Sequence, residues 1–485
     1  MNSKKTYQEI AKATTILGSV QFISIIVSLI RNKVVAVLVG SAGVGILGLF
    51  TSSLGLVSSL TSIGLETSAV KSVANANLNP NLLSKEVSII KKIIWLTAIL
   101  GTLLTIILSP FLSEITFGTP NYTLAFVLVS ASLFFKQMTV GELAIIQGLQ
   151  KVRFFANANL FGNILALCVS IPLYYFYRID GIVPSIIVSS VVVFLVALFY
   201  SSKLKIEKTK IENKAVFTEG KAMMKLGFSL SFIGLLSTLT AYLLQIFISN
   251  YKSIADVGFY NAGFLILNTY VGIIFTAMVT DYFPRLSKDV DDDQKVTTIV
   301  SQQIMFGLLL LCPIVVLFIA LAKYFVPILF TDEFLEIIPY IVIGIIGMLF
   351  KSVSWSLGYV LIAKGDSKVF IKTSIFFNAI FLVLNILAYK YFGLKGLGIT
   401  FVVNHFIHFI VLNKVNQMKY NVFIDREIYK ILLISLIFGF STLFIHYYFD
   451  GSLKIVLFIM LIFISSIFSF YHLNRIIDFK NFRNK

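Results

Sequence analysis

Apolar stretches, separated by short polar segments, follow one another along almost the whole chain. A helix that crosses a membrane needs about 20 mostly apolar residues. The pattern predicts about fourteen such spans, near residues 10–38, 43–65, 93–117, 122–147, 155–177, 182–201, 226–250, 258–281, 301–330, 337–363, 370–391, 395–413, 428–449 and 454–473. We therefore expect an all-α polytopic membrane protein.

The composition strengthens this prediction. Of the 485 residues, 58% are hydrophobic and 13% are charged, whereas soluble domains average about 25% charged residues. Cys168 and Cys312 lie in apolar stretches and are too few for a disulfide framework. The formal charge of +17 does not indicate nucleic-acid binding, because the basic residues follow the loops between spans.

Those basic residues predict the orientation of the chain. With the N-terminus in the cytoplasm, and with residues toward the span ends counted in the adjoining segments, 30 of the 40 Lys and Arg residues are cytoplasmic, 6 lie in the opposite loops and 4 lie within spans. Because cytoplasmic loops carry the excess of Lys and Arg, both termini are expected on the cytoplasmic side.

The longest polar stretch, residues 202–225, is basic and divides the first six spans from the rest. It predicts an N-lobe over 1–201, a cytoplasmic linker over 202–225 and a C-lobe of six spans over 226–415. Residues 416–485 then hold the last two spans and a basic tail. The basic linker is also expected to contact anionic membrane lipid.

Short motifs recur between the two halves at nearly constant offsets. The matches are Ala42–Gly45 with Ala255–Gly258 at 213, Gly181 with Gly396 at 215, Lys136 with Lys351 at 215, and residues 147–152 with 364–369 at 217. Because six spans is an even number, the two copies keep the same orientation, which is a parallel repeat of the kind that transporters use. The sequence predicts two pseudo-symmetric six-helix bundles and two additional C-terminal helices.

Two lysines occupy matching positions deep inside predicted spans. Lys136 and Lys351 each lie about 11–14 residues from both ends of a span, or roughly 16–20 Å of helix. Their side chains are too short to reach the membrane surface from there. Ionisable groups at this depth usually face an aqueous cavity or a polar partner. A cavity with two cations favours an anionic substrate, and a purely structural pairing is the alternative.

Arg31 and Lys33 are further candidate cations, in the outward part of the first span. Their side chains point about 160° apart on a helix, so the two cannot both point directly into the same cavity. Snorkelling to the nearby membrane surface is the competing interpretation for each.

The acidic residues in or beside spans are Glu66, Glu142 and Asp281. They are candidates for binding a coupling proton or sodium ion, with solvation or pairing to neighbouring bases as the alternative. His405 and His408 share a helix face, but two histidines alone are weak evidence for a metal site. No metal site, bound cofactor or catalytic residue is predicted.

Several motifs in both halves resemble a known family. They are RNKVVAVLVGSAGVGILGLF (31–50), GLETSAVKSVA (64–74), IIQGLQKVRFFANANLFGNI (145–164), VGFYNAG (257–263), DYFPRLS (281–287) and SWSLGYVLIAKGDSKVFIKT (354–373). Over about residues 10–415 the chain resembles the O-antigen translocases. These are Wzx-type bacterial polysaccharide flippases of the multidrug/oligosaccharidyl-lipid/polysaccharide (MOP) exporter superfamily.

The resemblance implies a flippase rather than an enzyme, with two bundles around a central cavity that opens alternately to each side. The implied substrate is an oligosaccharide repeat unit on undecaprenyl diphosphate, moved from the cytoplasmic to the periplasmic leaflet of the bacterial inner membrane. Implied partners are a polysaccharide polymerase and chain-length machinery. Lys33 matches the position of a first-span lysine in the family, and cationic cavity residues are a feature of such flippases.

Three alternatives remain. A drug or cation antiporter of the same superfamily would need acidic rather than basic residues in mid-span. A flippase for another lipid-linked envelope precursor, such as one of peptidoglycan or teichoic acid, would fit the quoted motifs less well. An intramembrane ligase would need a large periplasmic loop, and no predicted periplasmic loop exceeds about a dozen residues.

Overall fold

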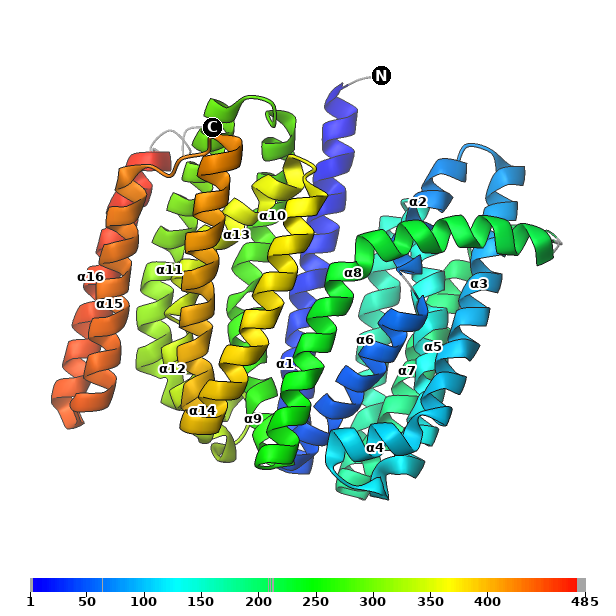
Figure 1. Cartoon of the computed structure of the whole chain (residues 1–485), viewed down its shortest axis with the longest axis horizontal. Coiled ribbons are helices and arrows are strands. Elements are labelled where there is room, and N and C mark those ends of the chain that lie inside the picture. Colours follow the sequence, from blue (N-terminus) through cyan, green and yellow to red (C-terminus); the bar gives the residue numbers. More distant parts are fainter. Residues whose placement is uncertain (1–2, 63, 208, 210, 212, 478–485) are drawn as a thin grey trace. The chain divides into compact units, whose positions relative to one another are not determined.

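The computed structural model describes residues 3–62, 64–207, 209, 211 and 213–477, and every regular element in these ranges is helical (Figure 1). The helices are α1 (Ser3–Ser62), α2 (Leu65–Ala76), α3 (Pro80–Ile107), α4 (Ser109–Phe117), α5 (Thr123–Gly148), α6 (Val152–Tyr177), α7 (Ile182–Ser202), α8 (Asn213–Tyr251), α9 (Ile254–Leu265), α10 (Ile273–Lys288), α11 (Asp293–Leu329), α12 (Ile338–Gly344), α13 (Gly347–Ala363), α14 (Ser367–Tyr420), α15 (Arg426–Tyr448) and α16 (Gly451–Ile477). Four short turns connect some of them: η1 (Pro120–Tyr122), η2 (Arg178–Gly181), the π-helical η3 (Ile266–Val271) and η4 (Asp332–Ile337).

Ten helical stretches in the described residues are long and apolar enough to cross a membrane, or eleven if the bent pair ending in α13 is one span. Three of the ten are interrupted by a residue with positive φ and non-helical ψ: α1 at Gly40, the α6–α7 stretch at Arg178, and α14 at Gly393. As a straight helix, the 54 residues of α14 would extend about 80 Å, far beyond the roughly 30 Å hydrocarbon core. The all-α polytopic fold is confirmed, and the number fourteen stays a prediction.

The chain forms two compact units. The N-unit contains Met1–Gly258 and Leu329–Thr331, and the C-unit contains Phe259–Ile328 and Asp332–Lys485. Helix α8 belongs to the N-unit because it packs against α1, α2, α3 and α4. Packing thus divides the chain after α8, at Gly258, whereas the C-lobe drawn from the sequence begins at residue 226, inside that helix.

Within the N-unit, α3 and α7 pack on α5, and α6 packs on α7 and α1. A cluster of buried side chains from α2, α3, α5 and α8 includes Val73, Ile90, Ile145 and Met223. Within the C-unit, α12 and α13 pack on α14, while α15 and α16 run side by side (Figure 1). These contacts fix the helices that carry the candidate site residues.

The backbone confirms the internal repeat. Arg178 and Gly393, 215 residues apart, both have positive φ, at 50° and 58°, where one predicted span ends and the next begins. Gly181 and Gly396 follow them by three residues. A Cβ at either glycine would lie 2.3 or 2.2 Å from the carbonyl oxygen eight residues earlier. The two halves therefore turn by the same local geometry.

One sequence match was aligned wrongly. Residues 147–152 and 364–369 are similar in amino-acid sequence at an offset of 217. The backbone turn within each segment aligns at an offset of 215. Gln150 (φ 56°) and Gly365 (φ 68°) are its left-handed residues, and α6 and α14 begin two residues after them. The backbone turn defines how the two copies of the repeat align, and the amino acids around the turn have diverged.

A close crossing marks the beginning of the repeat. A Cβ on Gly45 would lie 2.0 Å from the Ile254 carbonyl oxygen, and one on Gly258 would lie 2.0 Å from that of Ser41. Both glycine–carbonyl contacts are thus related by an offset of 213. At Lys136 and Lys351 the offset has increased to 215. The second copy contains the π-helical η3 between Gly258 and Lys351, and a π-helical turn holds more residues than an α-helical one.

Candidate functional site

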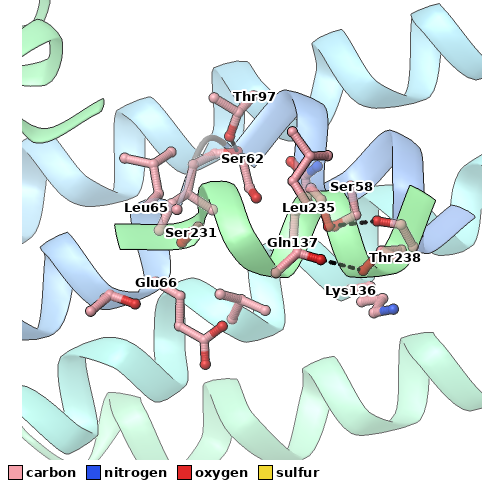
Figure 2. Close-up of a pocket in the computed structure, with 17 residues that line it drawn as sticks. Ser58, Ser62, Leu65, Glu66, Thr97, Lys136, Gln137, Ser231, Leu235 and Thr238 are labelled. Carbon is pink, nitrogen blue, oxygen red and sulfur yellow. Dashed lines mark hydrogen bonds between the residues drawn. The ribbon is translucent and has the colours of Figure 1, made fainter. Parts of the chain in front are cut away.

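Two cavities lie within the N-unit, and Lys136 of α5 lines both. Cavity 1, of about 500 Å³, is lined by α1, α2, α3, α5 and α8 (Figure 2). Cavity 2, of about 450 Å³, is lined by α1, α5, α6 and α7. Both fall in the range of roughly 300–1,000 Å³ that is typical of ligand pockets.

Lys136 lies 13 residues after the first residue of α5 and 12 before the last, about 18–20 Å of helix from either end. Its side chain is nevertheless exposed, because it borders both cavities. Within the described residues it has no hydrogen-bond or ion-pair partner. An ammonium group without a partner at this depth requires water or an anionic ligand.

Arg31 of α1 is the second cation of cavity 2. Its side chain is exposed, and it too lacks a partner among the described residues. The lining residues that the structure describes add hydroxyl and amide groups, among them Thr51, Ser132 and Asn163, and include no carboxylate. Cavity 2 therefore combines two free positive charges with neutral hydrogen-bonding groups.

Glycines allow the helices around cavity 1 to approach closely. Gly64 has φ +67°, and a Cβ on it would lie 2.1 Å from the Gly227 carbonyl oxygen and 2.4 Å from the Ser231 hydroxyl. Only glycine tolerates both the left-handed backbone and this contact. Gly64 therefore brings Glu66, two residues later in α2, to the same cavity as Ser231 of α8.

On the other side of cavity 1, Gln137 Nε2 donates to Thr61 Oγ1 at 2.7 Å, which joins α5 to α1. Gly101 of α3 faces this pair, and a Cβ there would lie 2.9 Å from Thr61 Oγ1. The small residue leaves room for the buried bond. This bond fixes the position of the residue that follows Lys136.

Lys351 of α13 occupies the equivalent position in the C-unit but has different surroundings. Its Nζ donates to Asn268 Oδ1 at 2.7 Å, and Asn268 belongs to the π-helical η3. The same Nζ lies 5.7 Å from the ring centre of Phe275 and 6.0 Å from that of Phe401. An amide and two aromatic faces thus compensate its charge.

The other predicted site residues are paired within the protein. Lys33 Nζ donates to the Phe330 backbone carbonyl in the N-unit. Glu142, whose side chain is 4% exposed, forms an ion pair of 2.9 Å with Lys91. Asp281 is 74% exposed and pairs with Arg285 at 2.9 Å. Of the three candidate carboxylates, Glu66 is the one that lines a cavity and has no partner among the described residues.

The AKGDSK motif forms a clasp outside the spans of the C-unit. Asp366 caps α14 by accepting a hydrogen bond from the Val369 backbone N–H at 3.1 Å. Lys419 and Tyr420, at the other end of α14, bond to the same carboxylate. The hydrogen bond from Lys419, followed by the one from Val369, lowers the pKa of Asp366 below its usual value.

Sequence reasoning concentrated on charges and missed the neutral lining of the cavities. Ser58, Ser59 and Ser62 line cavity 1 from one helical face, and Ser24 and Ser28 line cavity 2 on the same face as the predicted Arg31. Their spacing of three and four residues inside apolar spans is the signal that would have identified them.

Comparison with known proteins agrees with this architecture. Residues 34–339 match the family model described as "Polysaccharide biosynthesis protein". A search of curated protein sequences finds no match.

Solved structures share the fold at low sequence identity. The lipid II flippase MurJ in its inward closed conformation aligns with a TM-score of 0.64 and 14% identity, over 90% of this chain and 97% of that one. An inward-facing multidrug resistance MATE family transporter of the MOP superfamily gives 0.62 and 13%, over 83% and 94%. A MOP superfamily transporter from Pyrococcus furiosus, with a binding pocket described as reversed in polarity, gives 0.58 and 16%, over 84% and 96%.

The family match covers more than half of the chain, and the structural matches cover both units. The family model shows the family, and the solved structures confirm the fold that the sequence motifs implied. The chain is a member of the polysaccharide biosynthesis protein family and has the membrane-transporter fold of the MOP superfamily.

Proposed function

We propose that this protein is a flippase for an oligosaccharide repeat unit of the O-antigen type linked to undecaprenyl diphosphate. It moves the headgroup from the cytoplasmic to the periplasmic leaflet of a bacterial inner membrane by alternating access. The observation that carries the proposal is cavity 2, where Arg31 and Lys136 line one space and neither has a partner among the described residues.

The chemistry of such a substrate matches that cavity. A diphosphate is multiply charged and crosses hydrocarbon only if other groups replace its water. Charge-assisted hydrogen bonds from a guanidinium and an ammonium are among the strongest replacements. The apolar residues of cavity 2, such as Leu47, Leu167 and Val193, suit a headgroup attached to a lipid chain.

The cavity also argues against a cation antiporter. Binding a cationic drug would need carboxylates in the lining, whereas the described lining of cavity 2 holds two cations and no carboxylate. Transport of a different lipid-linked envelope precursor would use the same phosphate chemistry. The identity of the sugar therefore has to be tested genetically.

The test is complementation of a bacterial strain that lacks its O-antigen flippase, with surface polysaccharide as the readout. The wild-type protein is expected to restore polysaccharide and Lys136→Met to reduce it at least tenfold, with both at equal abundance in the membrane. Lys323→Met, which removes an exposed lysine far along the chain from both cavities, is the matched control. Failure of the wild-type protein in strains of every saccharide type, despite correct membrane insertion, would refute the proposed function.

A further inference from the structure

Cavity 1 contains hydrogen-bonding groups that the phosphate chemistry of cavity 2 does not use. Glu66 reaches it with an exposed carboxylate. The hydroxyls of Ser58, Ser62, Thr67 and Ser231 line it as well. In the described part of the chain, none of these five side chains has a hydrogen-bond or ion-pair partner. Several acceptors and donors are therefore available to a ligand.

Gln137 provides an independent indication of a ligand. The residue is 3% exposed, and its Oε1 is buried and accepts no hydrogen bond from the described residues. Its Nε2 is already committed to Thr61. A buried amide oxygen without a donor costs about 1–3 kcal/mol. A donor from a molecule in the cavity it lines would remove that cost.

The charges and the size of cavity 1 define the class of that molecule. Glu66 and Lys136 lie toward opposite ends of the cavity, with Gln137 and Leu235 between them (Figure 2). The carboxylate disfavours an anion and the ammonium disfavours a cation. A volume of about 500 Å³ is also far larger than a single ion occupies. A neutral molecule with many hydroxyls satisfies both charged groups and the hydroxyls around them.

We propose that cavity 1 is a saccharide subsite, in which Glu66, Gln137 and the surrounding hydroxyls bind the first sugars of the substrate. Lys136, which borders both cavities, marks the junction between these sugars and the diphosphate in cavity 2. This assignment rests on the proposed function, since it places two parts of one lipid-linked substrate in adjoining cavities.

Gly234 of α8 offers a variant that fills the cavity with little risk to folding. It lines cavity 1, and a Cβ built on it meets no atom within 4 Å. Replacing a helical glycine also favours the helix by up to about 1 kcal/mol. Gly234→Leu therefore occupies the cavity, while Gly234→Ala, with the same helix gain and little volume, is the matched control.

Binding to the purified full-length protein in detergent is measured with three probes: undecaprenyl diphosphate, the lipid-linked repeat unit from a strain that the wild-type protein complements, and the free oligosaccharide. Gly234→Leu is expected to weaken binding of the lipid-linked repeat unit about tenfold, which corresponds to roughly 1.4 kcal/mol. Binding of undecaprenyl diphosphate should stay within twofold of the wild type. Glu66→Gln should show the same selectivity with a smaller loss, and Gly234→Ala should bind all probes as the wild type does.

Each other outcome overturns a defined part of the account. Equal weakening of undecaprenyl diphosphate and its glycosylated form by Gly234→Leu, or no weakening of either, refutes the saccharide subsite but leaves the flippase proposal standing. Stabilisation by sodium ions that Glu66→Gln abolishes would make cavity 1 a cation site instead. If wild-type protein binds none of the lipid probes, the proposed function itself fails.

Discussion

Lys136 and Lys351 stand 215 residues apart at equivalent positions of the repeat, but they differ in what their ammonium groups contact. Lys351 donates to Asn268 Oδ1 at 2.7 Å, whereas Lys136 borders two cavities and has no partner among the described residues. The repeat has therefore produced one lysine that is available to a ligand and one that is held by the protein.

This difference predicts unequal effects of the same substitution. Lys136→Ala should reduce export of surface polysaccharide at least tenfold without lowering the amount of protein in the membrane, because it removes a ligand contact. Lys351→Ala should reduce export less, and mainly by lowering stability, because it leaves the partly buried Asn268 Oδ1 without its donor. Export and thermal unfolding are measured for both variants; equal loss of export at equal stability would contradict the asymmetry.

Arg31 should contribute to anion binding through its charge. Arg31→Gln is expected to weaken binding of undecaprenyl diphosphate several-fold and to make the remaining affinity less dependent on salt, because one charge-assisted contact is lost. Arg31→Lys should retain part of the affinity. The check is a binding titration at two salt concentrations. An unchanged affinity for Arg31→Gln would show that the guanidinium does not contact the phosphate.

The crossing of Gly45 and Gly258 predicts a steric effect on stability. A Cβ at either position would lie 2.0 Å from a backbone carbonyl oxygen, so Gly45→Ala and Gly258→Ala should each destabilise the protein by about 1–3 kcal/mol. The double variant should cost less than the sum, since the first methyl already separates the helices. Thermal unfolding in detergent tests this, with Gly234→Ala as the unobstructed control; three equal melting temperatures would contradict the geometry.

The clasp at Asp366 predicts a dependence on pH. Lys419 and the Val369 N–H lower the pKa of Asp366 in the folded protein relative to about 3.9 when unfolded. The clasp therefore contributes fully above pH 4 and is lost as the pH falls through the folded-state pKa. Asp366→Asn should lower thermal stability at pH 7 and reduce its dependence on acid. Asp291→Asn, in an exposed loop, should change neither property.

The apolar pattern predicted the helical class and the position of the membrane helices, because hydrophobic length directly reflects the bilayer. It also predicted the breaks at Gly40 and Gly393 as gaps between neighbouring spans. The partner of Lys351 escaped prediction because Asn268 is 83 residues away and its direction depends on a local π-helix. The pairing of Glu142 with Lys91 likewise depends on how α3 packs on α5, which spacing along the chain does not reveal.

The most direct test of the central claim is the affinity of undecaprenyl diphosphate for purified wild-type protein and for Lys136→Met, which keeps an unbranched side chain one atom shorter and removes its charge. We expect the wild type to bind and the variant to lose at least tenfold in affinity while unfolding at the same temperature. Equal affinity for the two proteins would show that Lys136 does not hold the diphosphate and would contradict the account.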